Sequence, residues 1–497
     1  MNKKYKEFKA KMSKLADINY AAAVLGWDQE VNLPENAKAI RSQQLATLSG
    51  IGYENFINDE LGDLLKELNI ADDLSQKEKV NVNQVKKSYD KIAKKPKTFV
   101  VNMSKAISAA YFAWHEAKEK KDFKIFEGRL DELIKLKKEE AELIGYNNHI
   151  YDALLDEYEP GATVKDLDVL FIDVKENMVS FVKEITEQQQ VDDSFLYKHY
   201  GQDKQWNFGI DLLIQMGYDF KSGRQDLSAH PFTTNFGSTD VRVTTRVDVN
   251  NLSEMVWSCI HEGGHALYEQ GLSIEDYGLP TSSAISLGIH ESQSRLWENN
   301  VGRSLPYWNA NFGKLQQLFP ENLTGVSAED FYKASNKVSP SLIRTNADEL
   351  TYHFHILIRY ELEKALMEGN IKTADLQNAW NQKYKDYMDI DVPSVDKGVL
   401  QDIHWSHGSF GYFPTYSLGS FYAAQFYKQA EKDISDLSSK IENGNMIPLL
   451  DWLRTNVHQY GQLYTADELC ERITGEKLNF KYFMEYAKEK YAGIYGF

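Results

Sequence analysis

The stretch Ser258–Gly271 reads SCIHEGGHALYEQG and places His261 and His265 four residues apart. Residues with this spacing lie one turn apart on the same face of an α-helix. Their imidazole rings can therefore meet at one metal ion, and Zn²⁺ accepts two neutral imidazole nitrogens together with one oxygen ligand. Glu262 cannot easily reach the same ion, but its carboxylate can reach a water molecule bound there. The alternative interpretation is two ordinary histidines on one helix face.

Two glycines, Gly263 and Gly264, stand between the two histidines. A glycine inside a helix destabilises it by about 1 kcal/mol relative to alanine. Two adjacent glycines suit a helix whose backbone is approached closely by another group.

A metal that acidifies water, beside a carboxylate that accepts the proton, is the HExxH chemistry of zinc peptidases. The stretch therefore predicts a metal site with Glu262 as general base.

A catalytic zinc needs a third protein ligand. The extended motif with a third histidine fails, because Tyr268 and Gly271 stand where glycine and histidine would be required. The acidic candidates downstream are Glu269, Glu275, Glu291 and Glu298. We favour Glu291, because a helix that returns antiparallel after a turn can aim it at the histidines. Alternatively, Glu291 is a surface residue that pairs with Arg295 one turn later.

The sequence changes character upstream of this helix. Residues 230–236 (HPFTTNF) and 240–246 (DVRVTTR) are rich in threonine and valine, and the second segment alternates with a period of two. Gly237 and Ser238 supply a turn between them. We expect a small antiparallel sheet at about residues 230–246, directly before the metal-site helix.

The rest of the chain is dominated by helical patterns. Over the first 220 residues or so, apolar side chains recur at helical spacing with charged residues between them. Helices resume after the predicted sheet, where Asn251 or Ser253 can cap a helix that Gly271 can end. We therefore expect the metal-site helices at about residues 251–300.

Composition narrows the class of protein. The chain has 497 residues, more than one simple core usually organises, so two domains or one body with two lobes are expected. The net charge of -17 argues against nucleic acid and anionic membranes as partners. Cys259 and Cys470 are too few for a disulfide framework, and no run of 18 apolar residues occurs. We expect a cytoplasmic protein without a membrane span, in which YAAAVLGW near the start belongs to a helix.

Short motifs along the chain resemble those of a known family. In order they are HPF (230–232), DVRVT (240–244), HEGGH (261–265), HESQ (290–293), IRTNAD (343–348) and GVLQDIHW (398–405). LGWDQEVNLP near the start and YTADELCERITGEKLN near the end are also similar. In these segments the chain resembles the carboxypeptidase Taq family of metallocarboxypeptidases, over essentially its whole length and with no departure at the metal-binding positions.

The resemblance implies a mainly helical fold: one peptidase domain over residues 1–497, with two lobes around a deep central groove and a small antiparallel sheet next to the HExxH helix. It implies a homodimer with one Zn²⁺ per subunit, or Co²⁺ in its place. The implied activity is stepwise release of single C-terminal amino acids from peptides. His261, His265 and Glu291 map to the metal ligands, and Glu262 maps to the general base.

A carboxypeptidase must also bind a free C-terminal carboxylate, and the planar guanidinium of arginine does this best. Arg344 is the first candidate, followed by Arg242 and Arg246. In the alternative reading, Arg344 and Arg242 pair with carboxylates such as Asp348 and tie the motifs together. His230 either lines the substrate site or only caps the strand pair.

Residues around 404–421 form a segment rich in glycine and aromatic residues, which we read as a loop that lines the site. The oxyanion of the reaction needs a donor besides the metal. Tyr412 and His404 are the candidates, and Tyr416 is a weaker third. All three can instead simply pack. Asp402 can orient a histidine.

Two other functions compete with this prediction. The first is a helical metallo-oligopeptidase or dipeptidyl carboxypeptidase with the same metal chemistry, since groove depth decides which bond reaches the metal. The second is a binding protein with a structural metal. Structural zinc is usually enclosed by four protein ligands, often cysteines, and this chain has two cysteines and an intact Glu262.

Overall fold

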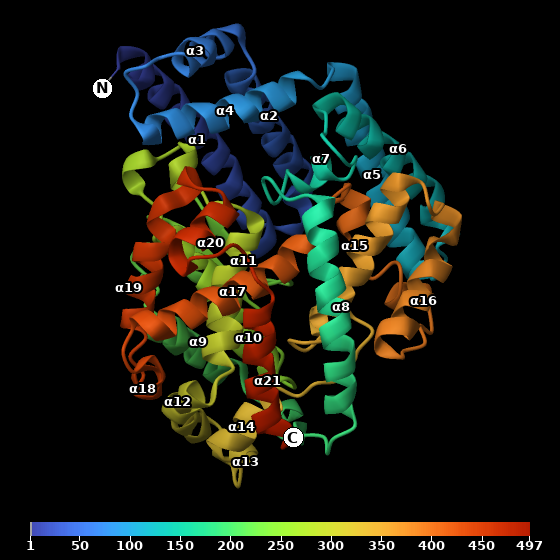
Figure 1. The fold of residues 1–497 in the computed structure, drawn as a ribbon, viewed down its shortest axis with the longest axis vertical. Coiled ribbons are helices and arrows are strands. Elements are labelled where there is room, and N and C mark those ends of the chain that lie inside the picture. The colour runs from blue at the N-terminus through green and yellow to red at the C-terminus, as the bar shows by residue number, and fades with distance from the viewer. Residues whose placement is uncertain (1) are drawn as a thin grey trace. The chain divides into compact units, whose positions relative to one another are not determined.

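A computed structural model describes residues 2–497. The fold is mainly helical with one small sheet, as predicted (Figure 1). The chain forms two compact units, each assembled from segments far apart in the sequence. The first unit comprises residues 2–92, 192–335 and 422–478, and the second comprises residues 93–191, 336–421 and 479–497.

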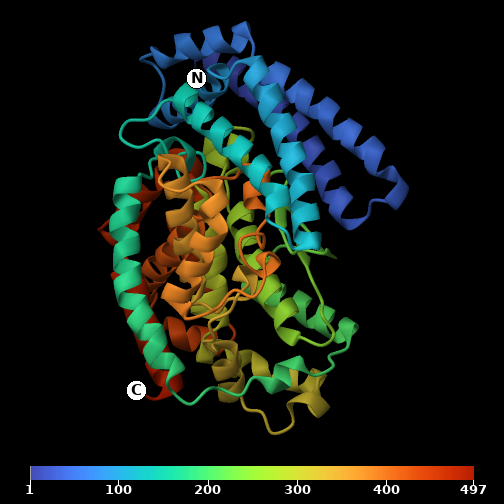
Figure 2. The ribbon, with the colours of Figure 1, turned by 90° about the vertical axis from the view of Figure 1, so that its right-hand side faces the viewer.

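The first unit carries the sheet and the HExxH helix. Its helices are α1 (Lys3–Val31), η1 (Glu35–Ala37), α2 (Lys38–Phe56), α3 (Asp59–Asn69), α4 (Gln76–Ala93), η2 (Ser194–Tyr197), α9 (Gln202–Met216), α10 (Leu252–Gln270), η3 (Ile274–Asp276), η4 (Pro280–Ser282), α11 (Leu287–Arg295), η5 (Leu296–Gly302), α12 (Leu305–Leu318), α13 (Pro320–Leu323), α14 (Ala328–Ser335), α18 (Leu437–Glu442), α19 (Ile447–Asn456), η10 (His458–Leu463) and α20 (Ala466–Thr474). Figure 2 shows α1 and α2 side by side over most of their length, in dark blue.

The second unit is helical. Its helices are α5 (Lys97–Lys120), α6 (Lys124–Ile144), α7 (Asp152–Leu155), α8 (Val164–Thr186), η6 (Arg344–Asn346), α15 (Tyr352–Glu368), η7 (Thr373–Asp375), α16 (Leu376–Met388), η8 (Val395–Lys397), η9 (His404–His407) and α21 (Lys481–Tyr495). Helix α17 (Pro414–Asp433) begins in this unit and ends in the first. On α6 the apolar side chains that recur at helical spacing are buried, among them Phe126, Leu130 and Leu133. No helix of residues 2–497 combines the length and apolarity that crossing a membrane requires.

The sheet has the predicted antiparallel strand pair and one further strand. β2 (Thr233–Asn235) runs antiparallel to β3 (Val241–Thr245), and Gly237 adopts a φ of 115° in the turn between them. β1 (Gln225–Leu227) pairs with the other edge of β3 in parallel, so the sheet is mixed rather than purely antiparallel. The sequence did not indicate β1, because its residues (QDL) include none of the threonine or valine that marks the other two strands.

Helix α10 begins and ends where the sequence predicted. The Asn251 side chain caps it by accepting a hydrogen bond from the backbone N–H of Ser253, and Gly271 follows its last residue. The helix packs against β2 and β3 on one side and against α9 and α11 on others. On the sheet side, the Thr245 and Ser258 hydroxyls lie 2.6 Å apart. This packing buries most of α10 and fixes the direction of its polar side chains.

The aromatic segment at residues 404–421 differs from the prediction. The segment 404–421 is not a loop throughout, because α17 starts at Pro414 and takes in Tyr416. Proline favours the first turn of a helix, where its missing N–H is not needed. The groove expected between two lobes stays a prediction.

Candidate metal centre

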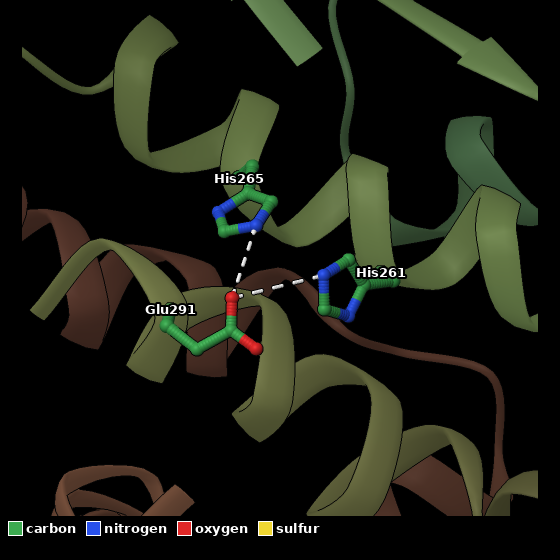
Figure 3. Close-up of side chains that lie close together, drawn as sticks. All are labelled: His261, His265 and Glu291. Atoms are coloured by element: carbon green, nitrogen blue, oxygen red, sulfur yellow. Dashed lines mark ion pairs between the residues drawn. The ribbon is translucent and has the colours of Figure 1, made fainter. Parts of the chain in front are cut away.

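Three side chains from two neighbouring helices point at one spot (Figure 3). His261 and His265 come from α10, and Glu291 comes from α11. Oε2 of Glu291 lies 3.5 Å from Nε2 of His265 and 3.8 Å from Nε2 of His261. Among residues 2–497, these three form the group of histidine, cysteine and acidic residues that can hold a metal, with donor atoms within 4.8 Å of one another.

The donor set and its spacing fit a small divalent cation. Two ligands at about 2.0–2.2 Å from a tetrahedral zinc lie about 3.3–3.6 Å apart. The distances from Glu291 to His265 and His261 are within this range or slightly above it. Two imidazole nitrogens and one carboxylate oxygen are also a ligand set that leaves a fourth position open in catalytic zinc sites.

The second ring nitrogen of each histidine has an acceptor of its own. Nδ1 of His261 lies 2.9 Å from Oε2 of Glu298, and Nδ1 of His265 lies 3.1 Å from the carbonyl oxygen of His290. A carbonyl oxygen only accepts, so Nδ1 of His265 carries the hydrogen. The Nε2 lone pair of that ring is then free for a metal. Such partners orient metal-binding histidines.

Glu291 uses its two oxygens for different partners. The sequence left open whether Glu291 faces the histidines or pairs with Arg295, and it does both, since Oε1 accepts a 2.7 Å hydrogen bond from Nε of Arg295. Glu291 is not a surface residue, because only 7% of it is exposed. Burial raises its pKa, but Arg295 and the two histidines outweigh burial and hold the pKa below its usual value. Glu291 is therefore an ionised ligand candidate.

The two histidines differ in their affinity for protons. Burial lowers the pKa of His261, but Glu291 and Glu298 outweigh it, so the pKa lies above its ordinary value. Burial, with nearby His290, lowers the pKa of His265 to about 3. His265 is therefore neutral at neutral pH, which is the form a metal binds.

Glu298 hydrogen-bonds to His261 instead of joining the ligand set. It lies in η5, a π-helical continuation of α11. Besides His261, its carboxylate accepts hydrogen bonds from Nη1 of Arg295 at 3.1 Å and Nη2 of Arg303 at 2.9 Å. Burial raises the pKa of Glu298, but Arg295, His261 and Arg303 together lower it far below its ordinary value. An ionised carboxylate thus faces Nδ1 of His261.

Glu262 is buried on α10 beside the ligand candidates. The Thr233 hydroxyl lies 2.7 Å from its Oε2, within hydrogen-bonding distance. Burial raises the pKa of Glu262, and the Glu291 carboxylate adds to the rise, while His261 and Thr233 act against it. A carboxylate with a raised pKa is a better proton acceptor, which suits a general base.

The other two acidic candidates lie outside the ligand group. Oε1 of Glu269 lies 2.8 Å from Nε2 of His290, and the His290 ring stacks on His265 with centroids 4.4 Å apart. Glu269 therefore contacts His290, and the His290 ring in turn stacks on the ligand candidate His265. The position of Glu269 one turn beyond His265 on the same helix allows this indirect contact. Glu275 is exposed in η3.

Substitution of Glu298 by Gln is expected to weaken zinc binding by about 10–100-fold, the usual effect of losing a partner of a metal-binding histidine. The amide NH₂ of glutamine must face either Nδ1–H of His261 or an arginine, and both are donors. The zinc dissociation constant, measured by competition with a chelating dye, tests this. Glu275→Gln is the matched control and should bind zinc as the parent does. Equal affinity in both variants contradicts the role given to Glu298.

Comparison with known proteins agrees with the geometry of this centre. The sequence profile of carboxypeptidase Taq (M32) metallopeptidases matches residues 7–491. The chain belongs to this family. It is therefore a metallocarboxypeptidase, a peptide hydrolase of a metal-dependent class, as its motifs predicted.

Carboxypeptidases from several organisms are similar to this chain over nearly its whole length. Carboxypeptidase 1 of Bacillus subtilis is 39% identical over 99% of this chain and 98% of its own. Thermostable carboxypeptidase 1 of Thermus thermophilus is 39% identical with the same coverage. The crystal structure of an M32 carboxypeptidase from Deinococcus radiodurans superposes with a TM-score of 0.98 at 36% identity, covering all of both chains.

Arg344, the first candidate for binding the substrate carboxylate, lies in the second unit and is 7% exposed. Its Nε and Nη2 donate to Oδ1 of Asp402 at 3.0 and 2.9 Å, and Nη1 donates to the Tyr352 hydroxyl. Arg359 binds the other oxygen of Asp402. Arg344 therefore makes an ion pair that ties the segments IRTNAD and GVLQDIHW together, as the alternative interpretation required, although its partner is Asp402 and not Asp348. A role in substrate binding remains a prediction.

The oxyanion candidates lie close to one another, in the same unit as Arg344. The His404 ring lies 5.2 Å from the Tyr412 ring, and Nε2 of His404 lies 3.4 Å from the Tyr416 hydroxyl. Nδ1 of His404 is 4.0 Å from Asp402. Burial lowers the pKa of His404 to about 4, with Asp402 acting against it. His404 is therefore neutral near pH 7.

The three remaining substrate-binding candidates, Arg242, Arg246 and His230, belong to the first unit, and Nε of Arg246 lies 3.7 Å from Oε2 of Glu254. Arg242 makes a two-pronged ion pair with Asp240, with both bonds at 2.9 Å, and its guanidinium lies over the Trp27 ring. His230 is exposed ahead of β2, and its carbonyl oxygen accepts from the Ser228 hydroxyl. The structure brings none of these three residues into the ligand group, and their substrate contacts remain predictions.

Proposed function

We propose that this M32 metallocarboxypeptidase removes single C-terminal amino acids from peptides by attack of water, with a divalent cation held by His261, His265 and Glu291. The observation that carries the proposal is the convergence of these three side chains beside Glu262. The family supplies the substrate class, which is peptides with a free C-terminus.

Glu262 acts as the general base. His261, His265 and Glu291 would hold a divalent cation, which would supply the acidification of water and the polarisation of the scissile carbonyl. Glu262 takes a proton from the attacking water while the water oxygen forms a bond to the carbonyl carbon. It then gives that proton to the leaving nitrogen as the C–N bond breaks. The hydrogen bond from Thr233 holds Oε2 of Glu262 and keeps the carboxylate in one orientation.

Other side chains bind the peptide. Arg344, with Arg242 next, is the proposed partner of the C-terminal carboxylate, since a guanidinium offers two parallel donors. Tyr412 and His404 are proposed to donate hydrogen bonds to the oxyanion. Neutral His404 still has one N–H to offer. His230 is proposed to line the peptide site.

The cation is proposed to be zinc, one per subunit, with cobalt able to replace it. Nitrogen and carboxylate donors at tetrahedral spacing suit zinc. We further propose a cytoplasmic homodimer in which residues 1–497 act as one peptidase domain with two lobes around a groove. The family resemblance supports these features, and the two buried free thiols of Cys259 and Cys470 are compatible with a reducing compartment.

The decisive experiment is a time course on one unblocked peptide, followed by mass spectrometry. We expect single residues to leave in order from the C-terminus, at a rate that falls to background with chelator and returns with zinc or cobalt. Release of dipeptides or internal fragments would replace the proposed reaction with that of a dipeptidyl carboxypeptidase or an oligopeptidase. If the zinc-loaded protein did not cleave the peptide, the proposed peptidase reaction would be wrong, and only metal binding by this site would remain. A peptide with a C-terminal amide is the control and should be cut poorly.

A further inference from the structure

A buried carboxylate in the second unit has no part in the reaction described above. Glu363 lies on α15 and is fully buried, with 0% exposed. Its Oε1 accepts a 2.7 Å hydrogen bond from Nε1 of Trp405, and its Oε2 accepts a 2.8 Å hydrogen bond from the backbone N–H of Gly411. The Tyr151 hydroxyl also donates to Oε2. Both carboxylate oxygens are therefore engaged by donors.

The two N–H donors sit next to the proposed oxyanion donors. Trp405 directly follows His404, and Gly411 directly precedes Tyr412. One carboxylate thus binds both ends of the segment that separates His404 from Tyr412. Their rings lie 5.2 Å apart, so a shift at either end changes the spacing of the pair.

Glycine at position 411 is a condition for this contact. Gly411 has a φ of 92°, which side chains other than hydrogen rarely allow. A Cβ at this position would also lie 2.7 Å from the carbonyl oxygen of Leu154. The backbone can therefore turn its N–H toward Glu363 only without a side chain.

The chemistry of the contact selects a carboxylate. Two N–H groups can donate but not accept, so they need an acceptor on each side of the Glu363 head group. An ionised carboxyl group offers two acceptors, whereas an amide offers one. Burial raises the pKa of Glu363 to about 7, even though Gly411, Tyr151 and Trp405 all act to lower it. The carboxylate form therefore predominates at pH 8.

We propose that Glu363 is a positioning residue for the peptidase reaction, which holds Trp405 and Gly411 and so sets the spacing of His404 and Tyr412. The inference rests on the proposed role of those two residues as oxyanion donors. It deepens that role, because the two N–H groups that bind Glu363 belong to Trp405 and Gly411, next to the proposed oxyanion donors.

The test is the kinetics of zinc-loaded Glu363→Gln at pH 8. One side of the glutamine amide must face an N–H donor, so the segment shifts. A misplacement of about 1 Å can cost on the order of 100-fold in rate. We expect kcat to fall by about 10–100-fold, with KM within about twofold and zinc content unchanged. Glu361→Gln on the same helix is the matched control and should keep the parental kcat. A parental kcat in folded Glu363→Gln overturns the proposal.

A second variant covers the case in which Glu363→Gln does not fold. Trp405→Phe removes one donor and leaves the carboxylate bound to Gly411 and Tyr151, so we expect a smaller loss of kcat at the same KM. Where both variants fold, the double variant should be about as slow as Glu363→Gln alone, because both act through one segment. If the falls in kcat of the two single variants multiply in the double variant, the positioning role is contradicted. A Trp405→Phe variant that loses heat stability but keeps the parental kcat contradicts it as well.

Variants of the proposed oxyanion donors test the oxyanion role of His404 and Tyr412 separately from the positioning role of Glu363. If His404→Ala and Tyr412→Phe lower kcat while Glu363→Gln does not, the positioning role is wrong and the proposed function stands. If His404→Ala and Tyr412→Phe both keep the parental kcat, the segment has no part in the reaction. The positioning role then fails together with the oxyanion role, while zinc-dependent release of C-terminal residues remains.

Discussion

Glu262→Gln is expected to keep its zinc and to lose peptidase activity, with kcat falling by about 10²–10⁴-fold, the usual contribution of a general base. Glutamine keeps the size of the side chain and can still accept a hydrogen bond from Thr233, so the pocket should stay folded. It cannot take the proton of the attacking water. Zinc content by atomic emission and kcat on an unblocked peptide measure the two properties separately.

A second glutamine variant on the same helix controls for the substitution itself. Glu254 lies in the first turn of α10, two turns before His261, and its Oε2 lies 3.7 Å from Nε of Arg246. Glu254→Gln should have parental kcat and zinc content. If Glu262→Gln kept most of its kcat, another group would have to accept the proton. If it lost zinc, the loss of activity would say nothing about a base.

Local spacing predicted the HExxH helix and its ends because both depend on residues near one another in sequence. His261 and His265 need only one turn of helix, and the Asn251 cap needs only the residues after it. Glu291 required more, namely that α11 returns beside α10. Sequence spacing favours an Arg295 partner just as strongly, and only the structure shows that the two oxygens of Glu291 serve both directions.

The residues that orient the site were harder to predict. Thr233 reaches Glu262 because β2 packs against α10, a contact between segments that no local pattern encodes. Glu298 did carry a signal, since it lies seven residues after Glu291 and so near the same helix face. The sequence offered it as a ligand candidate, but the π-helical turn places it against Nδ1 of His261 instead.

In the second unit, short motifs in the sequence did not predict whether their residues contact the substrate or pair with one another. IRTNAD and GVLQDIHW contain Arg344 and Asp402, which pair with each other. A resemblance identifies such residues without saying whether they contact substrate or only one another. Glu363 lies in neither motif, and its buried contacts with Trp405 and Gly411 come only from the fold.

Gly264→Ala is expected to damage the metal site by separating two helices. A Cβ on Gly264 would lie 2.7 Å from the carbonyl oxygen of Gln293 and from Cα of Ser294, both backbone atoms of α11. Backbone cannot move aside as a side chain can, so α11 must shift and take Glu291 with it. Overpacking of this kind costs about 1–3 kcal/mol of folding free energy. We expect zinc affinity to fall by at least about tenfold and activity to fall with it at limiting zinc.

The adjacent glycine provides the matched control. A Cβ on Gly263 would meet Cδ2 of Leu213 at 2.7 Å and Cε of Met216 at 3.0 Å, which are the ends of flexible side chains. These ends can rotate away, and alanine gains about 1 kcal/mol of helix propensity over glycine. Gly263→Ala should therefore bind zinc nearly as the parent does. Excess zinc should restore part of the activity of Gly264→Ala, because Glu262 is still present. Equal zinc affinity in the two variants would mean that the close approach of α11 to Gly264 does not hold Glu291 in place.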